Sequence, residues 1–373
     1  MPRPQAPRLF LVDGYALIYR AFFALGAQPL RSSRGENTSI ARGTNDFITK
    51  LIQTHQPEYL GWVHDRGLSF RHELYPAYKA TRERLEPEQQ VDFDEGVTRV
   101  EELLAAYRIP ILSLDGYEAD DVIGTMARQA VAAGVNVVVV SGDKDFAQLV
   151  RPGVWILNPW HGRPGATTEK WYDTENVTER LGVPAERVVD FLALKGDSSD
   201  NVPGVTGVGP VGAVKLLKQF GSLRKAVAAA KAADASIPPK TAKALIDAEK
   251  DVDLYLTLIK LDEDVPIKRS ISDCRLQAPD EAKLRAVFAR LEFGSLLKEM
   301  LPPPAGEPAR SVRSTLPAGG GRLAVAVERP QTAVVPNWQE VPFASLKKEL
   351  LSAKQILAAA YRGEATLVDG SRV

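Results

Sequence analysis

Aspartate residues stand at the ends of three short apolar runs in the sequence: Asp13, Asp65, and the pair Asp143 and Asp145. At any one of these positions the simplest role for an aspartate is to start a turn or cap a helix. In an open parallel sheet, however, the carboxyl ends of the strands lie along one edge, where ligands bind. If the three runs are neighbouring strands, their acids meet in one crevice.

Two further acidic clusters follow. Glu118, Asp120 and Asp121 stand together at the expected start of a helix, where the helix dipole accounts for one or two acids. A third is unexpected, because Glu118 and Asp121 lie one turn apart and would repel one another unless a cation lay between them. Asp197 and Asp200 repeat this spacing, so we expect them to share a helical face as well.

Converging these carboxylates without counter-charge would be strongly unfavourable. Oxygen ligands in a chain with four histidines suit Mg²⁺ or Mn²⁺ rather than zinc. Two such ions about 4 Å apart commonly serve in-line phosphoryl displacement, where one lowers the pKa of the attacking water and the other stabilises the leaving oxygen. The sequence therefore predicts a site for two Mg²⁺ (or Mn²⁺) ions, with the candidate ligands Asp13, Asp65, Glu118, Asp120, Asp121, Asp143, Asp145, Asp197 and Asp200.

A basic segment with interleaved aromatic residues follows the second apolar run. It contains Phe70, Arg71 and His72, and then residues 78–82, which include Tyr78 and Lys79. Side chains of these types can bind phosphates and stack on a base. By chemistry alone, a solvated helical face is the simpler interpretation.

The segments that carry these residues alternate in kind. Short apolar runs predict buried strands, and the longer amphipathic stretches between them predict helices. This alternation is typical of an α/β fold, with a mostly parallel central sheet flanked by helices. The expected strands cover residues 9–12, 59–63, 109–114, 135–140 and 154–157, and the expected helices between them include 94–107 and 120–133.

The second half of the chain differs in composition. After about residue 175 it is expected to be mostly helical, with one long helix at 281–300. Residues 301–322 are rich in proline and glycine, which is typical of a linker. Beyond them we expect a strand at 323–327 and a helix at 343–360, too little for an independent core. The predicted parts are a core (1–175), a helical subdomain (176–300), a linker (301–322) and a short tail (323–373).

Residues 207–212 spell GxGxxG, the fingerprint of a dinucleotide-binding enzyme. That fingerprint needs a preceding strand and an acid roughly twenty residues later. Here it lies in a region expected to be helical. We interpret it instead as a helix–hairpin–helix near residues 202–220, whose glycines let backbone amides approach DNA phosphates. The expected DNA contacts are Gly204, Gly207, Gly209, Lys215 and Lys218.

Composition sets few limits. The 373 residues carry a formal net charge of zero, although a carboxylate-rich site would mask a basic binding surface in that sum. The one cysteine, Cys274, excludes an internal disulfide framework and a cysteine-based zinc site. The N-terminus lacks the apolar core of a secretory signal, and no apolar run near the middle could span a bilayer. A cytoplasmic protein with no membrane partner is expected.

Six segments, in order, resemble the signatures of one family. They are LVDGYALIYRAFFAL, FRHELYPAYKATR, GYEADDVIGTMA, SGDKDFAQLV, LKGDSSDNVPGVTGVG and RLEFGSLLKE. The sequence is similar to the 5′-nuclease (5′→3′ exonuclease) region of bacterial DNA polymerase I, in the flap endonuclease superfamily, over roughly residues 8–300. The resemblance implies a PIN-like nuclease core. It also implies cutting of DNA at flaps, nicks or 5′ ends, including RNA primer–DNA hybrids, as in primer removal and repair, by a monomer.

The resemblance assigns the metal ligands to two groups. The first ion is implied to lie on Asp13, Asp65, Glu118, Asp120 and Asp121. The second is implied to lie nearer Asp143, Asp145, Asp197 and Asp200. All nine acids are present, which favours an active nuclease.

The same resemblance places residues 70–92 in an arch or gateway over the active site. Lys79 is then implied to neutralise charge on the scissile phosphate. Arg82 would contact that phosphate or a neighbouring one, and Tyr78 would stack on a base. Arg71 is a weaker candidate for the role of Lys79.

Three positions depart from the family pattern. Where the family usually carries a lysine and then a threonine or serine, this chain has Val211 and Gly212, which removes a cation and a hydroxyl from the phosphate grip. Lys215 and Lys218 are candidates to compensate. His64 stands where phenylalanine is common, and strand alternation points it away from Asp65, so we interpret it as structural.

Two other functions fit parts of the pattern. A non-catalytic DNA-junction-binding module could keep the same fold, but loss of an acid would be expected there. A metal-dependent phosphatase or an RNA-processing nuclease could use a similar sheet. The helix–hairpin–helix and the basic segment argue against a small substrate.

Overall fold

The computed structural model describes residues 4–24, 28–163, 166–300, 339–341, 356–361 and 364–369. The chain divides into two compact units, residues 1–304 and residues 305–373. The expected linker at 301–322 and strand at 323–327 lie outside the described residues. In the described part of the chain, no helix is long and apolar enough to cross a membrane.

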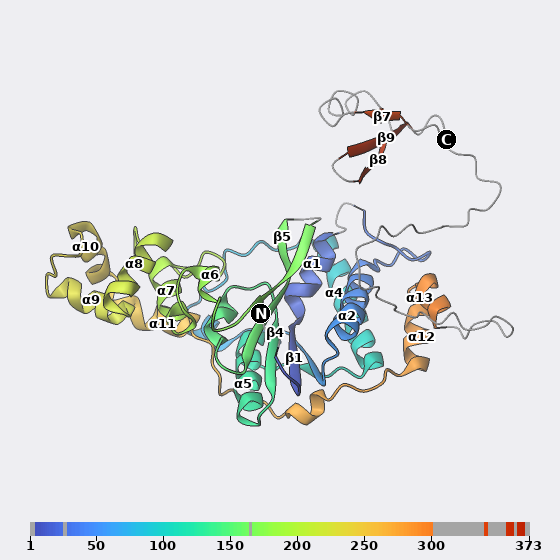
Figure 1. The fold of residues 1–373 in the computed structure, drawn as a ribbon, viewed down its shortest axis with the longest axis horizontal. Helices are drawn as coiled ribbons and strands as arrows, with labels where there is room; N and C mark the ends of the chain where they lie inside the picture. The colour runs from blue at the N-terminus through green and yellow to red at the C-terminus, as the bar shows by residue number, and fades with distance from the viewer. Residues whose placement is uncertain are drawn as a thin grey trace, which may run out of the picture. The chain divides into compact units, whose positions relative to one another are not determined.

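A six-stranded sheet forms the centre of the first unit (Figure 1). Its strand order is β3-β2-β1-β4-β5-β6. Strands β1 to β5 pair in parallel, and β6 pairs antiparallel to β5. The expected mostly parallel sheet is therefore confirmed. The strands are β1 (Arg8–Asp13), β2 (Tyr59–Val63), β3 (Ile111–Leu112), β4 (Asn136–Val140), β5 (Val154–Arg163) and β6 (Ala166–Tyr172).

The β5–β6 hairpin was not predicted. Pro159 interrupts the apolar pattern of β5, and proline removes a hydrogen-bond donor from the ladder. The chain continues past it as an edge pair whose register shifts between Asn158 and His161. A bulge of this kind lets a strand tolerate a proline.

Helices cover both faces of the sheet. The side chains of β1 alternate between two cores: Leu9 and Leu11 belong to one, and Phe10 and Val12 belong to the other. A strand buried on both faces reads as a continuous apolar run, which is why β1 was recognisable. The helices of this part are α1 (Gly14–Ala24), α2 (Ser39–His55), α3 (Phe70–Leu74), α4 (Pro87–Tyr107) and α5 (Ala119–Ala132).

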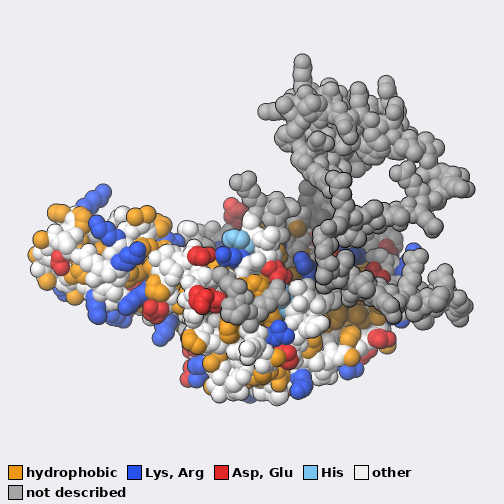
Figure 2. Space-filling view, in the orientation of Figure 1, with side chains coloured by type: hydrophobic (Ala, Val, Ile, Leu, Met, Phe, Trp, Pro, Cys, Tyr) orange, Lys and Arg blue, Asp and Glu red, His pale blue; other side chains and the backbone are white. Residues whose placement is uncertain are grey.

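A helical region follows the sheet, at the left of Figure 1. Exposed Lys and Arg side chains of α8, α9 and α10 gather on its surface, part of which Figure 2 shows. Its elements are α6 (Thr178–Leu181), η2 (Ala185–Arg187), α7 (Val188–Lys195), α8 (Pro210–Phe220), α9 (Leu223–Lys231), α10 (Pro239–Asp247), η3 (Glu249–Asp251) and α11 (Val252–Ile259).

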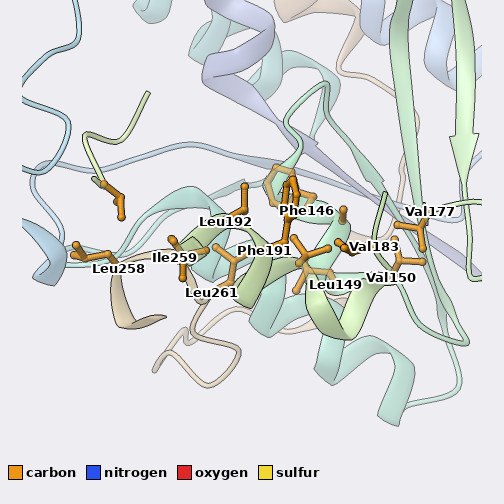
Figure 3. Packing of buried hydrophobic residues seen from close by; sticks show 14 of the residues in the cluster. Phe146, Leu149, Val150, Val177, Val183, Phe191, Leu192, Leu258, Ile259 and Leu261 are labelled. Carbon is orange, nitrogen blue, oxygen red and sulfur yellow. The ribbon is translucent and has the colours of Figure 1, made fainter. Parts of the chain in front are cut away.

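The helical region shares its core with the sheet. Phe146 in η1 (Asp145–Leu149), Phe191 in α7 and Leu258 in α11 belong to the same buried cluster as the strands (Figure 3). This packing fixes the segment after β4 against α7. It therefore holds the acids of that segment in place relative to the helical region.

The first unit ends in η4 (Ile271–Cys274), α12 (Glu281–Arg290) and α13 (Gly294–Glu299). The single helix expected at 281–300 is wrong, because the backbone breaks at Glu292, where φ is +58°. That left-handed conformation ends α12. Phe288 and Phe293 then pack together, with ring centroids 5.9 Å apart.

The second unit contains a three-stranded antiparallel sheet in the order β7-β9-β8. Its strands are β7 (Gln339–Val341), β8 (Ile356–Tyr361) and β9 (Glu364–Asp369). The helix expected at 343–360 is wrong over 356–360, where β8 pairs with β9, and its earlier residues lie outside the described part. A short apolar run does not distinguish a helix from a strand.

Candidate active site

The carboxyl ends of β1, β2 and β4 meet at one edge of the sheet. In register, Asp13 pairs with Val63, and Val12 pairs with Val140. The loops that follow β1, β2 and β4 therefore leave the sheet at the same edge. A pocket of about 470 Å³ opens there, and among its lining residues are Asp13, Asp65, Glu118, Asp120, Asp143, Lys79 and Arg82.

Hydrogen bonds set the orientation of the strand-end acids. Ser141 Oγ donates to Asp13 Oδ2 at 2.7 Å, and the Asp143 amide donates to Ser141 Oγ at 2.9 Å. Asp65 Oδ1 accepts from the Ala119 amide at 2.6 Å, in the first turn of α5. Local turns thus bring acids from separate strands to the start of α5.

A second acidic group lies beside the first. The Asp145 amide donates to Asp143 Oδ1 at 2.9 Å. Lys144 Nζ lies 3.2 Å from Asp145 Oδ1 and 2.6 Å from Asp197 Oδ2. Both of these carboxylate oxygens are buried. The ammonium of Lys144 is thus their electrostatic partner.

The electrostatics show how crowded these acids are. Burial raises the pKa of Asp13 to about 6, with smaller contributions from the charges of Asp143 and Asp65. Burial, and then the charges of Asp13 and Asp143, raise the pKa of Asp120 well above its usual value. Burial and Asp143 likewise raise the pKa of Asp145 to about 7. The charged forms are disfavoured, as expected where like charges share a site.

This donor set fits divalent metal ions. The pocket offers hard carboxylate oxygens, which Mg²⁺ and Mn²⁺ prefer. A bound cation would offset both the burial and the smaller like-charge repulsion that raise these pKa values. As the side chains stand, no three His, Cys, Asp or Glu residues of the described chain form a ready set of metal ligands. Lysines lie against the acids instead: Lys144 on Asp197, and Lys79 on Glu118.

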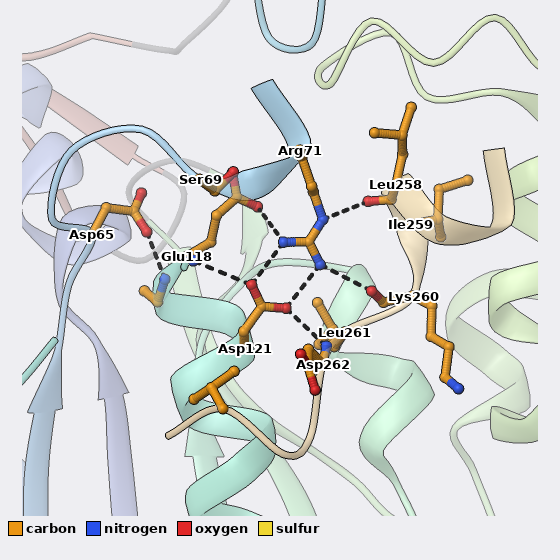
Figure 4. Close-up of polar contacts among 12 residues, drawn as sticks. Asp65, Ser69, Arg71, Glu118, Asp121, Leu258, Ile259, Lys260, Leu261 and Asp262 are labelled. Atoms are coloured by element: carbon orange, nitrogen blue, oxygen red, sulfur yellow. Dashed lines mark hydrogen bonds and ion pairs between the residues drawn. The ribbon is translucent and has the colours of Figure 1, made fainter. Parts of the chain in front are cut away.

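Arg71 and Asp121 are not where the sequence placed them. Arg71 is 1% exposed and Asp121 is fully buried. The guanidinium binds both oxygens of Asp121 and one oxygen of Glu118 (Figure 4). The cation expected between Glu118 and Asp121 is therefore Arg71. The expectations that Asp121 binds a metal and that Arg71 contacts DNA are wrong, because each satisfies the other in the interior.

Tyr78 is also buried, at 3% exposed. Its hydroxyl, which has one proton to share, lies within hydrogen-bond distance of Glu118 Oε2 (3.1 Å) and of Asp200 Oδ2 (3.0 Å). The expectation that Tyr78 stacks on a DNA base is therefore wrong, because its ring is enclosed by the protein. Tyr78 thus holds Glu118 and Asp200, which come from different segments, close to one another.

The two candidate catalytic cations, Lys79 and Arg82, follow Tyr78 in the sequence. Lys79 Nζ lies 2.6 Å from Glu118 Oε1. Burial alone would disfavour the charged amine, but Glu118 and Asp200 outweigh it and raise the pKa of Lys79. Arg82 is half-exposed and pairs with Asp200 Oδ1 at 2.8 Å. Both side chains line the acidic pocket.

Asp197 and Asp200 do not share a helical face. Residues 197–202 form a tight turn closed by two hydrogen bonds between the backbones of Asp197 and Val202. Asp197 faces Lys144, whereas Asp200 faces Arg82 and Tyr78. A left-handed residue, Asn201 (φ +57°), prevents a helix here.

The glycine-rich segment lies between α7 and α8, the two helices of the expected hairpin. Gly204 is buried, and a Cβ there would lie 2.3 Å from the Gly196 nitrogen, so its expected DNA contact is wrong. Gly207 and Gly209 are exposed, with open space where a Cβ would be.

Helix α8 presents its start and its two lysines to solvent. Lys215 and Lys218 are exposed, three positions apart on one face of the helix. Val211, at the start of α8, is 84% exposed and Gly212 is half-buried. Val211 and Gly212, two of the three positions that depart from the family pattern, thus lie in the first turn of α8.

Several residues of the site were missed by the sequence analysis. Ser141 and Lys144 stand within the Ser-Gly-Asp-Lys-Asp segment, and their proximity to the acids was a usable signal. Tyr15, Tyr19 and Phe93 line the pocket and pack together, with the Tyr19 and Phe93 centroids 4.5 Å apart. His64 stacks on Tyr15 at 5.2 Å, which agrees with a structural role.

Comparison with known protein families and relatives identifies the family of this chain. A family model described as the 5′-3′ exonuclease N-terminal resolvase-like domain matches residues 8–182, and one described as the 5′-3′ exonuclease C-terminal SAM fold matches residues 183–282. A 5′-3′ exonuclease of Aquifex aeolicus is 35% identical over 293 residues, which cover 78% of this chain and 94% of that protein. The chain belongs to the 5′-3′ exonuclease family.

Members of this family also form part of longer proteins. DNA polymerase I of Chloroflexus aurantiacus is 39% identical over 301 residues, which cover 79% of this chain and 31% of that protein. The chain thus spans about a third of the length of the polymerases that it matches. The family resemblance in the sequence is confirmed.

Solved structures support the fold. The T5 5′-exonuclease with bound zinc has a TM-score of 0.56 at 21% identity, over 78% of this chain and 98% of that one. The catalytic core of Rad2 in complex with DNA substrate has a TM-score of 0.51 at 18% identity, over 78% of this chain and 91% of that one. At these identities the likeness establishes the fold alone.

Proposed function

We propose that this chain is a structure-specific nuclease that hydrolyses DNA phosphodiester bonds at 5′ ends, flaps or nicks, as in primer removal and repair. One observation carries the proposal: acids from β1, β2 and β4 and from the start of α5 line the same pocket as Lys79 and Arg82. Carboxylates alone would repel a phosphodiester, so such a pocket fits a substrate that binds together with divalent cations. Membership of the 5′-3′ exonuclease family supports the same activity.

Two Mg²⁺ (or Mn²⁺) ions are the cofactors that the donor set fits. Asp13, Asp65, Glu118 and Asp120 would hold the first, and Asp143, Asp145, Asp197 and Asp200 the second. When bound, the ions would lower the pKa of an attacking water and stabilise charge on the phosphate and the leaving oxygen. Divalent ions bound to the T5 5′-exonuclease agree with this proposal.

The cations of the pocket would hold the substrate. Lys79, whose amine faces the acids, would donate to an oxygen of the scissile phosphate. Arg82, half-exposed at the same pocket, would bind that phosphate or a neighbouring one. Tyr19 is 43% exposed and packs on Phe93, so this pair, rather than Tyr78, would offer a stacking surface to a base.

The helical region would grip the duplex without reading its sequence. Gly207 and Gly209 are exposed and have open space beside their Cα atoms, so a DNA backbone could approach them closely, and Lys215 and Lys218 add positive charge on α8. The DNA substrate in the Rad2 complex agrees with this. We propose a cytoplasmic monomer, with 176–300 as the DNA-binding subdomain.

A labelled 5′-flap duplex tests the function. Cleavage should release labelled fragments with Mg²⁺ and none with EDTA, and Asp120→Asn should abolish it. Glu249→Gln, which alters an exposed acid paired with Lys231, is the matched control and should cut normally. If the wild-type protein binds the junction and does not cut it, the chain is the non-catalytic binding module instead.

A further inference from the structure

Arg71 is a fully buried arginine whose hydrogen-bonding capacity is used completely. Nε donates to Leu258 O at 2.8 Å. One terminal nitrogen donates to Asp121 Oδ2 at 2.7 Å and to Glu118 Oε2 at 3.4 Å. The other donates to Asp121 Oδ1 at 2.8 Å and to Lys260 O at 2.9 Å. The planar guanidinium carries five N–H groups, and the structure provides five acceptor contacts.

Asp121 is equally well satisfied. Besides the bidentate pair with Arg71, its Oδ1 accepts from the Asp262 amide at 2.8 Å. Its Oδ2 accepts from the Glu118 amide at 3.1 Å, which closes the capping box at the start of α5. The pair therefore links the start of α5 to residues 258–262, which end α11 and follow it (Figure 4).

Glu118 connects this buried pair to the pocket. Its Oε2 accepts from Arg71 and from the Tyr78 hydroxyl, and its Oε1 pairs with Lys79 Nζ at 2.6 Å. Glu118 is 7% exposed and lines the pocket, so its carboxylate lies at the boundary between the interior and the site. The position of Arg71 thus sets which oxygen of Glu118 remains toward Lys79.

Stability alone does not account for this arrangement. A buried ion pair carries a large desolvation penalty, and apolar residues of the same volume often stabilise a protein as much or more. Arg71 draws its acceptors from the start of α5 and from the end of α11 and beyond, and the contact with Leu258 joins positions 187 residues apart. A network of this kind specifies one geometry.

We propose that Arg71 is a positioning residue that fixes Glu118, and through it Lys79, in the geometry that binds metal and stabilises the transition state. The inference rests on the proposed nuclease function and adds to it that the end of α11 is tied to the reactive pocket. A lysine in place of Arg71 keeps the charge but loses the planar fork that reaches Asp121, Glu118 and the carbonyls together. The charge and the geometry can therefore be tested separately.

The first variant is Arg71→Lys. It should stay folded, with turnover on the flap duplex reduced at least ~10-fold and KM changed less than ~2-fold, because a transition-state interaction is lost while substrate binding stays intact. Free Mn²⁺, measured by its electron paramagnetic resonance signal without DNA, should show weaker binding. The matched control is Arg151→Lys. It alters a 2.5 Å ion pair with Glu263, the residue that follows the 258–262 segment contacted by Arg71. It should leave turnover and Mn²⁺ binding unchanged.

A second variant guards against simple unfolding. Arg71→Met with Asp121→Leu removes both charges, so no unpaired charge stays buried. It should fold and lose turnover to at least the same extent. Wild-type turnover in either variant would overturn the positioning role, and so would loss of the fold in both, which would make Arg71 a folding residue.

The Mn²⁺ measurement separates two failures. Wild-type protein that binds Mn²⁺ but leaves the flap duplex intact contradicts the nuclease function. Unchanged Mn²⁺ binding and turnover in Arg71→Lys contradicts the positioning role of Arg71 alone.

Discussion

Lys144 Nζ lies 2.6 Å from Asp197 Oδ2, joining the segment after β4 to the turn after α7. The amine also lies 3.2 Å from Asp145 Oδ1. A lysine thus lies against acids that we assign to the second metal ion. Lysine and metal cannot both be the main counter-charge of these two oxygens, so we expect them to compete.

Lys144→Met tests this competition. Without the amine, the metal-free protein should melt at a lower temperature, because Asp145 and Asp197 lose their cation. Adding ~10 mM Mg²⁺ should raise the melting temperature, because Mg²⁺ binds only the folded state. The gain should be larger than in the wild type, because the Lys144 amine no longer competes with the metal for these oxygens. Lys231→Met, which breaks an exposed pair with Glu249, serves as the control. An equal gain in Lys144→Met and the wild type would contradict the competition.

Lys79→Ala should separate chemistry from binding. We expect turnover on the flap duplex to fall ~100-fold or more, because Lys79 stabilises charge that develops on the phosphate. The dissociation constant for the duplex should change less than ~3-fold, because most phosphate contacts lie elsewhere. Lys170→Ala, which alters an exposed pair with Glu179, should change neither. Equal losses of turnover and affinity would make Lys79 a docking contact only.

The metal-free protein should lose stability as pH rises. Burial raises the pKa of Asp13 to about 6 and of Asp145 to about 7, from the ordinary value of 3.8. The folded state therefore binds these protons more tightly than the unfolded state, and their stabilisation is lost between about pH 4 and pH 7. Urea unfolding in EDTA should show the fall. Asp145→Asn should reduce this loss of stability by roughly 4 kcal/mol. An identical pH dependence in that variant would show that Asp145 does not titrate in this way.

Val211→Lys should strengthen the grip on duplex DNA. Val211 is 84% exposed at the start of α8, so a lysine there meets no packing obstacle. We expect the dissociation constant to fall several-fold and the salt dependence to steepen by about one phosphate contact, with turnover unchanged. Thr98→Lys, an exposed position on α4, adds the same charge away from α8. Equal gains in both variants would mean that only net charge matters.

The sequence predicted the parts of the site that depend on local signals. Apolar runs marked β1, β2 and β4, and the acids at their ends line one pocket because parallel strands share an edge. The rest of the fold was predicted from the resemblance of six ordered segments to one family.

The partners of Arg71 and Tyr78 could not be predicted in this way. Arg71 meets Leu258 across 187 residues, and Tyr78 meets Asp200 across 122 residues. Only the packing of the helical region against the sheet brings these atoms together. A basic, aromatic segment has the same composition whether it faces solvent or the interior.

The number of Mn²⁺ ions bound per chain, measured by equilibrium dialysis, tests the central claim most directly. We expect two ions in the wild type, one in Asp120→Asn and one in Asp197→Asn, because each variant removes a ligand of a different ion. No bound Mn²⁺ in the wild type, or an unchanged number in both variants, would contradict a shared carboxylate site for two metal ions.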